Sequence, residues 1–248
     1  KIRYGVHDGD LFELVHQKLM KAKQPTFSFV MTLSNHAPYE VPENFVGQVT
    51  SSNAPAKLKK RILDEDNFDK RMRALAYADH ALGEFFRKAK NSLYFKETLF
   101  VLTADHSHSF ALKWEPEEQY QLKIIPLYFY SPGLLKTSNT VNDSLSSHID
   151  ILPTILSLII EKPVMIHSWG RSLLEPPKSK LLLSNNLNCF NDVCIASNQI
   201  RALQKDQKLV LCKTPLCIEK SEHLTKIIKA YSNSATNYLY NYRIIKSE

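Results

Sequence analysis

The segment TLFVLTADH at residues 98–106 constrains the fold more than any other part of the 248-residue chain. Its short run of β-branched, aliphatic and aromatic residues is typical of a strand that is buried on both faces of a sheet. The run ends abruptly at Asp105 and His106, which place a carboxylate beside an imidazole. Because open α/β sheets bind their ligands beyond the carboxyl ends of their strands, we expect this pair at a binding edge.

Asp105 and His106 together offer one hard oxygen ligand and one nitrogen ligand, a combination that suits a divalent metal such as Zn²⁺ or Mn²⁺. An isolated pair of this kind also occurs where an ordinary strand ends in a polar turn, and Asp105 would then cap the next element. The other segments of the chain favour the metal site.

Apolar strand-like runs alternate with segments of helical periodicity along the chain as far as residue 160. The strands are expected at 26–33, 98–104 and 124–130, and the helices near 10–22, 66–90 and 150–160. This order predicts an α/β layered fold with a mainly parallel sheet. From residue 178 the pattern changes to short alternating runs, which predict a small antiparallel C-terminal subdomain. We therefore divide the chain into residues 1–177 and 178–248.

The predicted strand at 26–33 also ends in polar residues, in the segment TLSNHAPY at 32–39. Its His36 is a candidate for a group that contacts substrate, provided that this strand and the strand at 98–104 end at the same edge of the sheet. An imidazole there could stabilise a transferring group or protonate a leaving alkoxide. The alternative is a loop histidine whose ring is satisfied locally. Near the start of the chain, Asp8 or Asp10 is expected to be the N-cap of the first helix.

All four cysteines fall late in the chain, in two equally spaced pairs: Cys189 with Cys194, and Cys212 with Cys217. Their even number and clustering predict one or two disulfides and an oxidising compartment. The sequence leaves open whether each bond is local or links two short strands. A zinc ribbon is one alternative, although its cysteines are usually about two to four residues apart. Buried free thiols are the other.

The composition is globular, with 44% hydrophobic and 23% charged residues, and the six glycines argue against a glycine-rich phosphate loop. The net charge of +7 fits a basic surface beside anionic lipid or a phosphorylated substrate, although solvated lysines are the simpler explanation. The basic residues form one local cluster, at residues 57–61, and no stripe with interleaved aromatic residues. We therefore expect no nucleic-acid partner.

Five segments of the chain occur in a distinctive order with sensible gaps between them. They are TLSNHAPY (32–39), YADHALGEFF (77–86), TLFVLTADHSH (98–108), IIPLYFYSPG (124–133) and SSHIDILPTIL (146–156). Together they resemble the C-terminal half of the catalytic domain in the lipoteichoic acid synthase-like branch of the sulfatase/alkaline phosphatase superfamily. The resemblance covers about residues 4–175, since YGVHDGDLF (4–12) is similar to the segment that precedes the SNH strand in this branch. It implies an alkaline phosphatase/sulfatase-like layered fold.

The resemblance also implies roles for individual residues. In that family one divalent metal ion, commonly Mn²⁺ or Zn²⁺, is held by an acid, a Thr nucleophile and an Asp-His pair. The pair corresponds to Asp105 and His106, and a catalytic, substrate-contacting histidine corresponds to His36. The resemblance does not assign His108, which departs from the family's usual continuation after the Asp-His pair, or His148; from their positions we consider both as candidates for residues that support the metal ligands, and His108 also as an extra ligand. A surface position for His108 and a helix-capping turn for His148 are the alternatives.

The family's first metal ligand, a Glu, and its Thr nucleophile lie upstream of the segment that matches. We therefore expect the chain to be a fragment that lacks the N-terminal half of the catalytic domain. Such a fragment would carry an incomplete metal site and would have little activity by itself.

The function implied by the resemblance is a metal-dependent phosphoglycerol or phosphoethanolamine transferase. Its substrate would be a phospholipid-derived or other anionic component of the cell envelope. Its place would be the periplasmic or extracellular face of the bacterial inner membrane. One alternative is a sulfuric ester hydrolase or phosphodiesterase of the same superfamily, and another is a non-catalytic domain that retains the fold.

Overall fold

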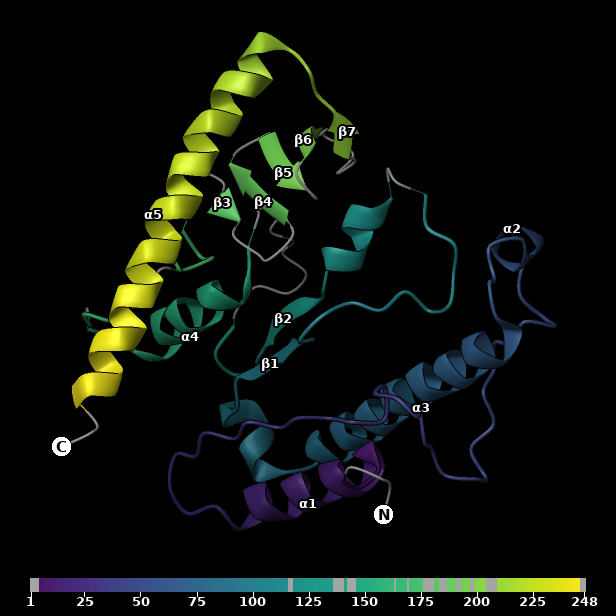
Figure 1. The fold of residues 1–248 in the computed structure, drawn as a ribbon. Coiled ribbons are helices and arrows are strands. Elements are labelled where there is room, and N and C mark those ends of the chain that lie inside the picture. The colour runs from purple at the N-terminus through teal and green to yellow at the C-terminus, as the bar shows by residue number, and fades with distance from the viewer. Residues whose placement is uncertain are drawn as a thin grey trace. The chain divides into compact units, whose positions relative to one another are not determined.

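Two compact units make up the chain in a computed structural model. The described residues are 5–115, 118–135, 141, 146–162, 164–168, 170–175, 181–182, 187–190, 193–196, 199–203 and 209–245. The first unit comprises residues 1–115 and 124–138, and the second comprises residues 116–123 and 139–248 (Figure 1). The predicted division after residue 177 stays a prediction.

Helices α1 (Asp8–Lys21) and α3 (Glu65–Ala89) pack against each other in the first unit (Figure 1). The rings of Phe12 on α1 and Phe85 on α3 lie 5.4 Å apart between centroids. At the surface, Lys88 Nζ lies 2.5 Å from Glu13 Oε2. Between the two helices a long irregular stretch contains only the single-turn helix α2 (Ala56–Lys59). The helices predicted near 10–22 and 66–90 are confirmed.

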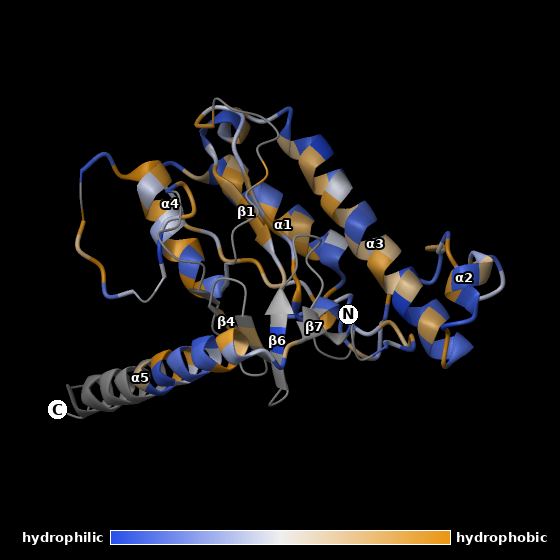
Figure 2. Ribbon diagram, turned by 90° about the horizontal axis from the view of Figure 1, so that it is seen from above, coloured by the Kyte–Doolittle hydropathy of each residue, from blue (hydrophilic) through white to orange (hydrophobic). Residues whose placement is uncertain are grey.

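Helix α3 forms because its sequence has a helix-starting residue and one apolar face. The side chain of Asp64, the N-cap, accepts a hydrogen bond of 3.0 Å from the backbone N–H of Asn67. Its ribbon alternates between hydrophilic and hydrophobic colours, the pattern of an amphipathic helix (Figure 2). The buried residues of α3 are Phe68, Ala74, Tyr77, Ala81, Phe85 and Ala89.

The predicted strands at 98–104 and 124–130 are present as β1 (Phe100–Thr103) and β2 (Leu127–Tyr130). The expected parallel pairing is wrong for them, because β1 and β2 pair antiparallel, with Phe100 opposite Tyr130 and Thr103 opposite Leu127. Strand β1 is also half-buried rather than buried on both faces. An apolar run predicts a strand, but the direction of its neighbour depends on the path of the chain between them.

An aromatic cluster joins β1 and β2 to the end of α3 and to the short helix η1 (Leu93–Glu97). Its members are Phe85, Phe86, Phe95, Phe100 and Tyr130, with ring centroids 5.0 to 6.3 Å apart. Contacts of this kind bury large apolar areas. The cluster therefore fixes the start of β1, and with it the position of the polar residues that follow the strand.

The strand predicted at 26–33 is not found. The segment has no regular secondary structure, and among the described residues no strand pairs with it. The relative solvent-accessible surface areas of Phe27, Phe29 and Met31 are 84%, 76% and 66%. A β-strand needs a neighbour to satisfy its backbone hydrogen-bonding groups, so an apolar alternation is not enough to make one.

In the second unit a tight turn precedes helix α4 (Ile151–Ile159), which confirms the helix predicted near 150–160. The buried carboxylate of Asp150 accepts hydrogen bonds of 2.9 Å from the backbone N–H groups of Ser147 and Arg171. A Cβ atom on Gly170 would lie 1.9 Å from the carbonyl oxygen of Ile149, so only glycine fits there. These contacts clamp residues 170–171 against the start of the helix.

A five-stranded antiparallel sheet and a long helix form the rest of the second unit, as the alternating pattern after residue 178 predicts (Figure 1). The sheet consists of β3 (Leu181–Leu182), β4 (Leu187–Phe190), β5 (Val193–Ala196), β6 (Gln199–Leu203) and β7 (Leu209–Leu211), and the long helix is α5 (Pro215–Ile245). The second unit also contains the short helices η2 (Gln119–Lys123) and η3 (His148–Asp150). The strands follow one another in sequence order across the sheet.

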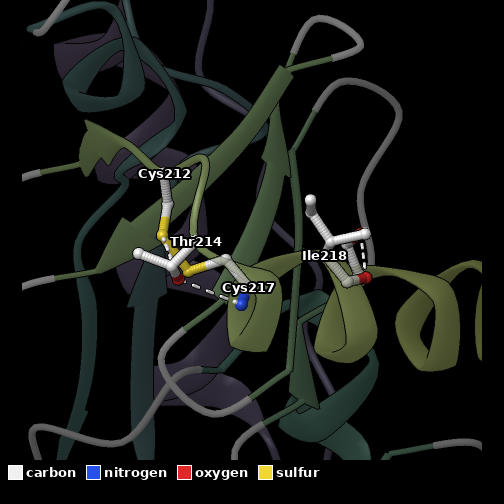
Figure 3. Close-up of a disulfide and its surroundings, with 5 residues drawn as sticks. Cys212, Thr214, Cys217 and Ile218 are labelled. Atoms are coloured by element: carbon white, nitrogen blue, oxygen red, sulfur yellow. Dashed lines mark hydrogen bonds between the residues drawn. A yellow bond between two sulfur atoms is a disulfide. The ribbon is translucent and has the colours of Figure 1, made fainter.

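Both disulfides of the second unit are local. Cys189 and Cys194 face each other across β4 and β5 and are bonded. Cys212, just after β7, is bonded to Cys217 in the first turn of α5 (Figure 3). The hydroxyl of Thr214 accepts a hydrogen bond of 3.3 Å from the backbone N–H of Cys217. Each bond therefore ties together two segments that are already adjacent in the sequence.

Candidate active site

Asp105 and His106 follow β1 directly, as two exposed residues of the first unit. The backbone N–H of His106 donates a hydrogen bond of 2.8 Å to Asp105 Oδ1. The imidazole Nδ1 of His106 lies 2.8 Å from the carbonyl oxygen of Ser107, which can only accept, so Nδ1 carries the proton. In the neutral ring Nε2 therefore has the lone pair, and it lies 3.6 Å from Asp105 Oδ2.

This arrangement fits a divalent metal ion. A backbone carbonyl that holds the Nδ1 proton is the usual partner of a histidine that ligates through Nε2. With bonds of about 2.1 Å in a tetrahedral site, two ligand atoms lie about 3.4 Å apart, close to the observed separation. Within the described ranges no third His, Cys, Asp or Glu joins Asp105 and His106 in a group that could hold a metal. The pair would therefore supply two ligands of a larger set.

The turn that carries His36 is anchored by a buried aspartate. Asp8 Oδ1 accepts hydrogen bonds of 3.0 Å from the backbone N–H groups of Leu33 and Ser34. In return, the backbone N–H of Asp8 donates to the hydroxyl of Ser34 at 3.2 Å. The expectation that Asp8 or Asp10 caps the first helix is wrong, because His7 holds the N-cap position and the Asp8 carboxylate reaches the other segment instead.

We expect Asp8→Ala to lower the free energy of unfolding by about 3 kcal/mol, since a half-buried and a buried N–H group would lose a charged acceptor. Asp10→Ala is the matched control, because it removes an exposed carboxylate from the same helical turn and should cost only about 0.5 kcal/mol. Denaturant unfolding of the two variants measures the difference. Equal losses would show that the contacts of Asp8 with residues 33–34 contribute no stability.

His36 itself is exposed at the tip of this turn. Its Nδ1 lies 2.7 Å from the carbonyl oxygen of Ala37, so this nitrogen carries a proton and Nε2 is the basic atom of the neutral ring. The backbone N–H of Tyr39 donates to the carbonyl of His36 at 2.8 Å. The hydroxyl of Tyr39 in turn lies 2.9 Å from Nε2 of His108, two residues beyond His106. This hydrogen bond joins the loop of His36 to the loop of the Asp-His pair.

His108 is half-buried and hydrogen-bonded rather than a surface histidine. Its Nδ1 accepts a hydrogen bond of 2.9 Å from the backbone N–H of Phe110, which leaves Nε2–H to donate to the hydroxyl of Tyr39. Burial lowers the pKa of His108, and the charges of Arg71 and His106 lower it further. The neutral ring is therefore favoured, with its two nitrogens in fixed roles. Whether His108 supports the metal ligands stays a prediction.

The other predicted residue, His148, lies in the second unit as the first residue of η3, where it is exposed. The turn is held by the hydrogen bond between Ser147 and Asp150 described above. A role for His148 in supporting the metal ligands stays a prediction.

Two residues of the first unit, Arg71 and Tyr39, join the site without having been singled out in the sequence. Arg71 lies on α3, and its Nη1 is 3.3 Å from Nδ1 of His108. No local motif marks it, because the contact joins residues 37 positions apart. Tyr39 lies within the segment 32–39, where only His36 carried an evident chemical role.

Comparison with known proteins identifies the family. The family model described as Sulfatase matches residues 2–160. A lipoteichoic acid synthase-like protein, YvgJ of Bacillus subtilis, is 23% identical over 213 residues, which are 79% of this chain and 32% of the relative. Lipoteichoic acid synthase 1 of B. subtilis is 27% identical over 168 residues, which are 63% of this chain and 24% of the relative. The chain thus spans about a quarter to a third of the length of these relatives.

Solved structures agree on the fold. A protein in the alkaline phosphatase superfamily from Vibrio parahaemolyticus superposes with a TM-score of 0.64 at 25% identity, over 94% of this chain and 56% of that one. The lipoteichoic acid synthase LtaP from Listeria monocytogenes superposes with a TM-score of 0.66 at 18% identity, over 96% of this chain and 61% of that one. The chain therefore belongs to the sulfatase family and has the α/β fold of the alkaline phosphatase superfamily.

Proposed function

We propose that this protein is a metal-dependent transferase of phosphoglycerol or phosphoethanolamine groups that acts at the cell envelope. The observation that carries the proposal is the geometry of Asp105 and His106, whose ligand atoms lie 3.6 Å apart with the His106 proton held by a carbonyl. Membership of a family of ester-cleaving and ester-transferring enzymes supports the same reading. The names of the lipoteichoic acid synthase relatives support transfer of a phosphate ester in particular.

In this proposal Asp105 and His106 hold one divalent ion, Mn²⁺ or Zn²⁺. When bound, such an ion would supply Lewis-acid chemistry, polarising a phosphoryl oxygen and favouring the ionised form of a nucleophilic hydroxyl. Asp105 contributes negative charge and His106 contributes the Nε2 lone pair. The remaining ligands, a Glu and a Thr that also serves as nucleophile, are proposed to come from the N-terminal half of the catalytic domain.

His36 is proposed to act on the substrate rather than on the metal. Its proton on Nδ1 is held by the carbonyl of Ala37, which leaves Nε2 as the nitrogen that can exchange a proton with the substrate. As an imidazolium the ring can protonate a leaving alkoxide, and as a hydrogen-bond donor it can stabilise charge on the transferring group. Exposure of the side chain makes it accessible to a substrate from solvent.

The proposed place of action is the outer face of the bacterial inner membrane, and the proposed substrate is an anionic phospholipid or a group derived from one. Two disulfides favour an oxidising compartment over a reducing one. The net charge of +7 favours an anionic substrate surface. Among the helices that the structure describes, none has the length and apolar character needed to cross a bilayer.

Treatment of the intact protein with a chelator is expected to abolish transfer of the lipid headgroup from glycerophospholipid vesicles to an added acceptor alcohol, a step in which diacylglycerol is the leaving product. Readdition of Mn²⁺ or Zn²⁺ should restore it, because the ion neutralises charge that develops on the phosphoryl oxygens. Diacylglycerol, acceptor product and metal content are measured on the same samples. Mg²⁺ is the control ion, since a site with an imidazole ligand favours the transition metals.

The same assay separates the alternatives. Hydrolysis of an aryl sulfate at a rate above that of the phospholipid would replace the transferase by a sulfuric ester hydrolase. Release of headgroup to water without an acceptor product would indicate a phosphodiesterase. Absence of turnover with any of these ions and substrates would favour a non-catalytic domain.

A further inference from the structure

Arg71 is held against the loop of the candidate site by three contacts. Its guanidinium carbon lies 5.2 Å from the centre of the Tyr39 ring, a cation–π distance. Its Nη1 lies 3.3 Å from Nδ1 of His108 and 3.4 Å from the hydroxyl of Ser109. These contacts position the guanidinium but use only one of its nitrogens as a donor.

The opposite edge of the guanidinium, made by Nε and Nη2, is without a partner among the described residues. Arg71 Nε is buried and makes no hydrogen bond there, and Nη2 makes none either. Within the described chain no carboxylate forms an ion pair with Arg71. A buried donor of a charged group without an acceptor is costly, so this edge calls for an oxygen ligand.

The other described arginines of the first unit show what this edge normally binds. In Arg61, Nε and Nη2 both donate to the carbonyl of Lys113, at 3.0 and 2.9 Å. In Arg73 they donate to the carbonyls of Phe45 and Pro42, at 2.8 and 2.9 Å. In Arg87 they donate to the two carboxylate oxygens of Glu84. Among these four arginines, Arg71 alone has an Nε–Nη2 edge that donates to no protein oxygen within the described residues.

We propose that the Nε–Nη2 edge of Arg71 binds a tetrahedral oxyanion of the substrate, with Tyr39 and His108 as positioning residues. The planar fork of arginine matches two oxygens of a phosphate or sulfate group, and its charge complements theirs. The Tyr39 ring stacks on the guanidinium, and His108 Nδ1 accepts a hydrogen bond from Nη1, the nitrogen outside the Nε–Nη2 edge. These two contacts keep the edge in one orientation. Because His108 lies two residues beyond His106, the anion would sit beside the proposed metal ligands.

This inference rests on the proposed function for the statement that the anion belongs to a substrate, but the binding site can be tested alone. Inorganic phosphate and inorganic sulfate are titrated calorimetrically into the intact, chelator-treated protein, so that no metal contributes to binding. Arg71→Lys keeps the positive charge and removes the two-nitrogen edge. We expect it to weaken phosphate binding about tenfold.

Arg87→Lys is the matched control, because Arg87 lies on the same helix and its edge is already bonded to Glu84. It should bind phosphate as the wild type does. Equal affinity in wild type and Arg71→Lys, or an equal loss in Arg87→Lys, would overturn the site. Unfolding midpoints of both variants are compared with the wild type, and a binding loss counts only in folded protein.

Tyr39→Phe tests the positioning role, since it keeps the ring over Arg71 and removes only the hydroxyl that bonds His108. We expect phosphate affinity to fall about threefold and KM for the phospholipid to rise while kcat is retained. A change in kcat alone, with unchanged phosphate affinity, would contradict this role.

The two anions distinguish the source of the ligand. Tighter Arg71-dependent binding of phosphate than of sulfate would assign the site to a phosphate ester, and the reverse order would assign it to a sulfate ester. If the wild-type protein binds phosphate through Arg71 but shows no turnover of the phospholipid, the proposed function is overturned and the anion site is not.

Discussion

Asp105→Asn is expected to reduce turnover of the intact enzyme by roughly 10³-fold or more and to lower its metal content. The substitution keeps the shape of the side chain and an oxygen that can accept from the His106 N–H, but it removes the negative charge that a divalent ion requires. The Asp105 side chain is 87% exposed, so the fold should be unaffected. Metal content per protein and initial rate are measured on the same preparation.

His106→Ala should have the same consequence, because it removes Nε2, the second ligand atom that we propose for the metal. Asp66→Asn is the matched control, since Asp66 is an exposed carboxylate on α3 that forms an ion pair with Lys70 at the surface. Its rate and metal content should match the wild type. Full activity in Asp105→Asn would refute the enzymatic proposal, because that proposal makes the Asp105 carboxylate a ligand of the metal.

His36→Ala is expected to lower turnover by about 10²- to 10⁴-fold, the range typical of the loss of a general acid or base, while the metal stays bound. The side chain is exposed and bonds the neighbouring carbonyl of Ala37, so its removal should leave the turn held by Asp8 in place. The rate is measured together with metal content and the unfolding midpoint.

The pH dependence of the residual turnover rate of His36→Ala tests the role of His36 in a second way. If His36 transfers a proton, the limb of the pH–rate profile that belongs to an imidazole should disappear in His36→Ala. His80→Ala is the control, because His80 is an exposed histidine on α3 that packs beside the Phe45 ring. Loss of the metal in His36→Ala would instead make His36 a ligand, and the role proposed here would be wrong.

The helices of this chain are predictable from the sequence because each must bury one face. Apolar residues recur at helical spacing in residues 8–21 and 65–89, and few other structures bury that pattern. The strands are less predictable. Residues 100–103 form a strand because β2 lies beside them, whereas residues 26–33 have an equally apolar pattern and no such neighbour among the described residues. Partner choice is a long-range property that periodicity does not encode.

The cysteines show the same division between local and long-range information. Their clustering late in the chain predicts disulfides, but four cysteines allow three pairings. The antiparallel register of β4 and β5 places Cys189 opposite Cys194, and the turn after β7 brings Cys212 to Cys217. The pairing thus follows from strand register and a helix start, neither of which the spacing alone determines.

By itself, the sequence determined the chemical identity of the candidate ligands, because Asp105 and His106 are adjacent and follow a strand-forming run. Only the tertiary structure decided how these groups are oriented and what surrounds them. The carbonyl of Ser107 sets the tautomer of His106, and the ring of Tyr39 meets His108 from a position 69 residues away. Arg71 reaches the same histidine across 37 residues. Contacts over such separations depend on how α3 and the loops pack, and packing is a property of the whole folded unit rather than of any local segment.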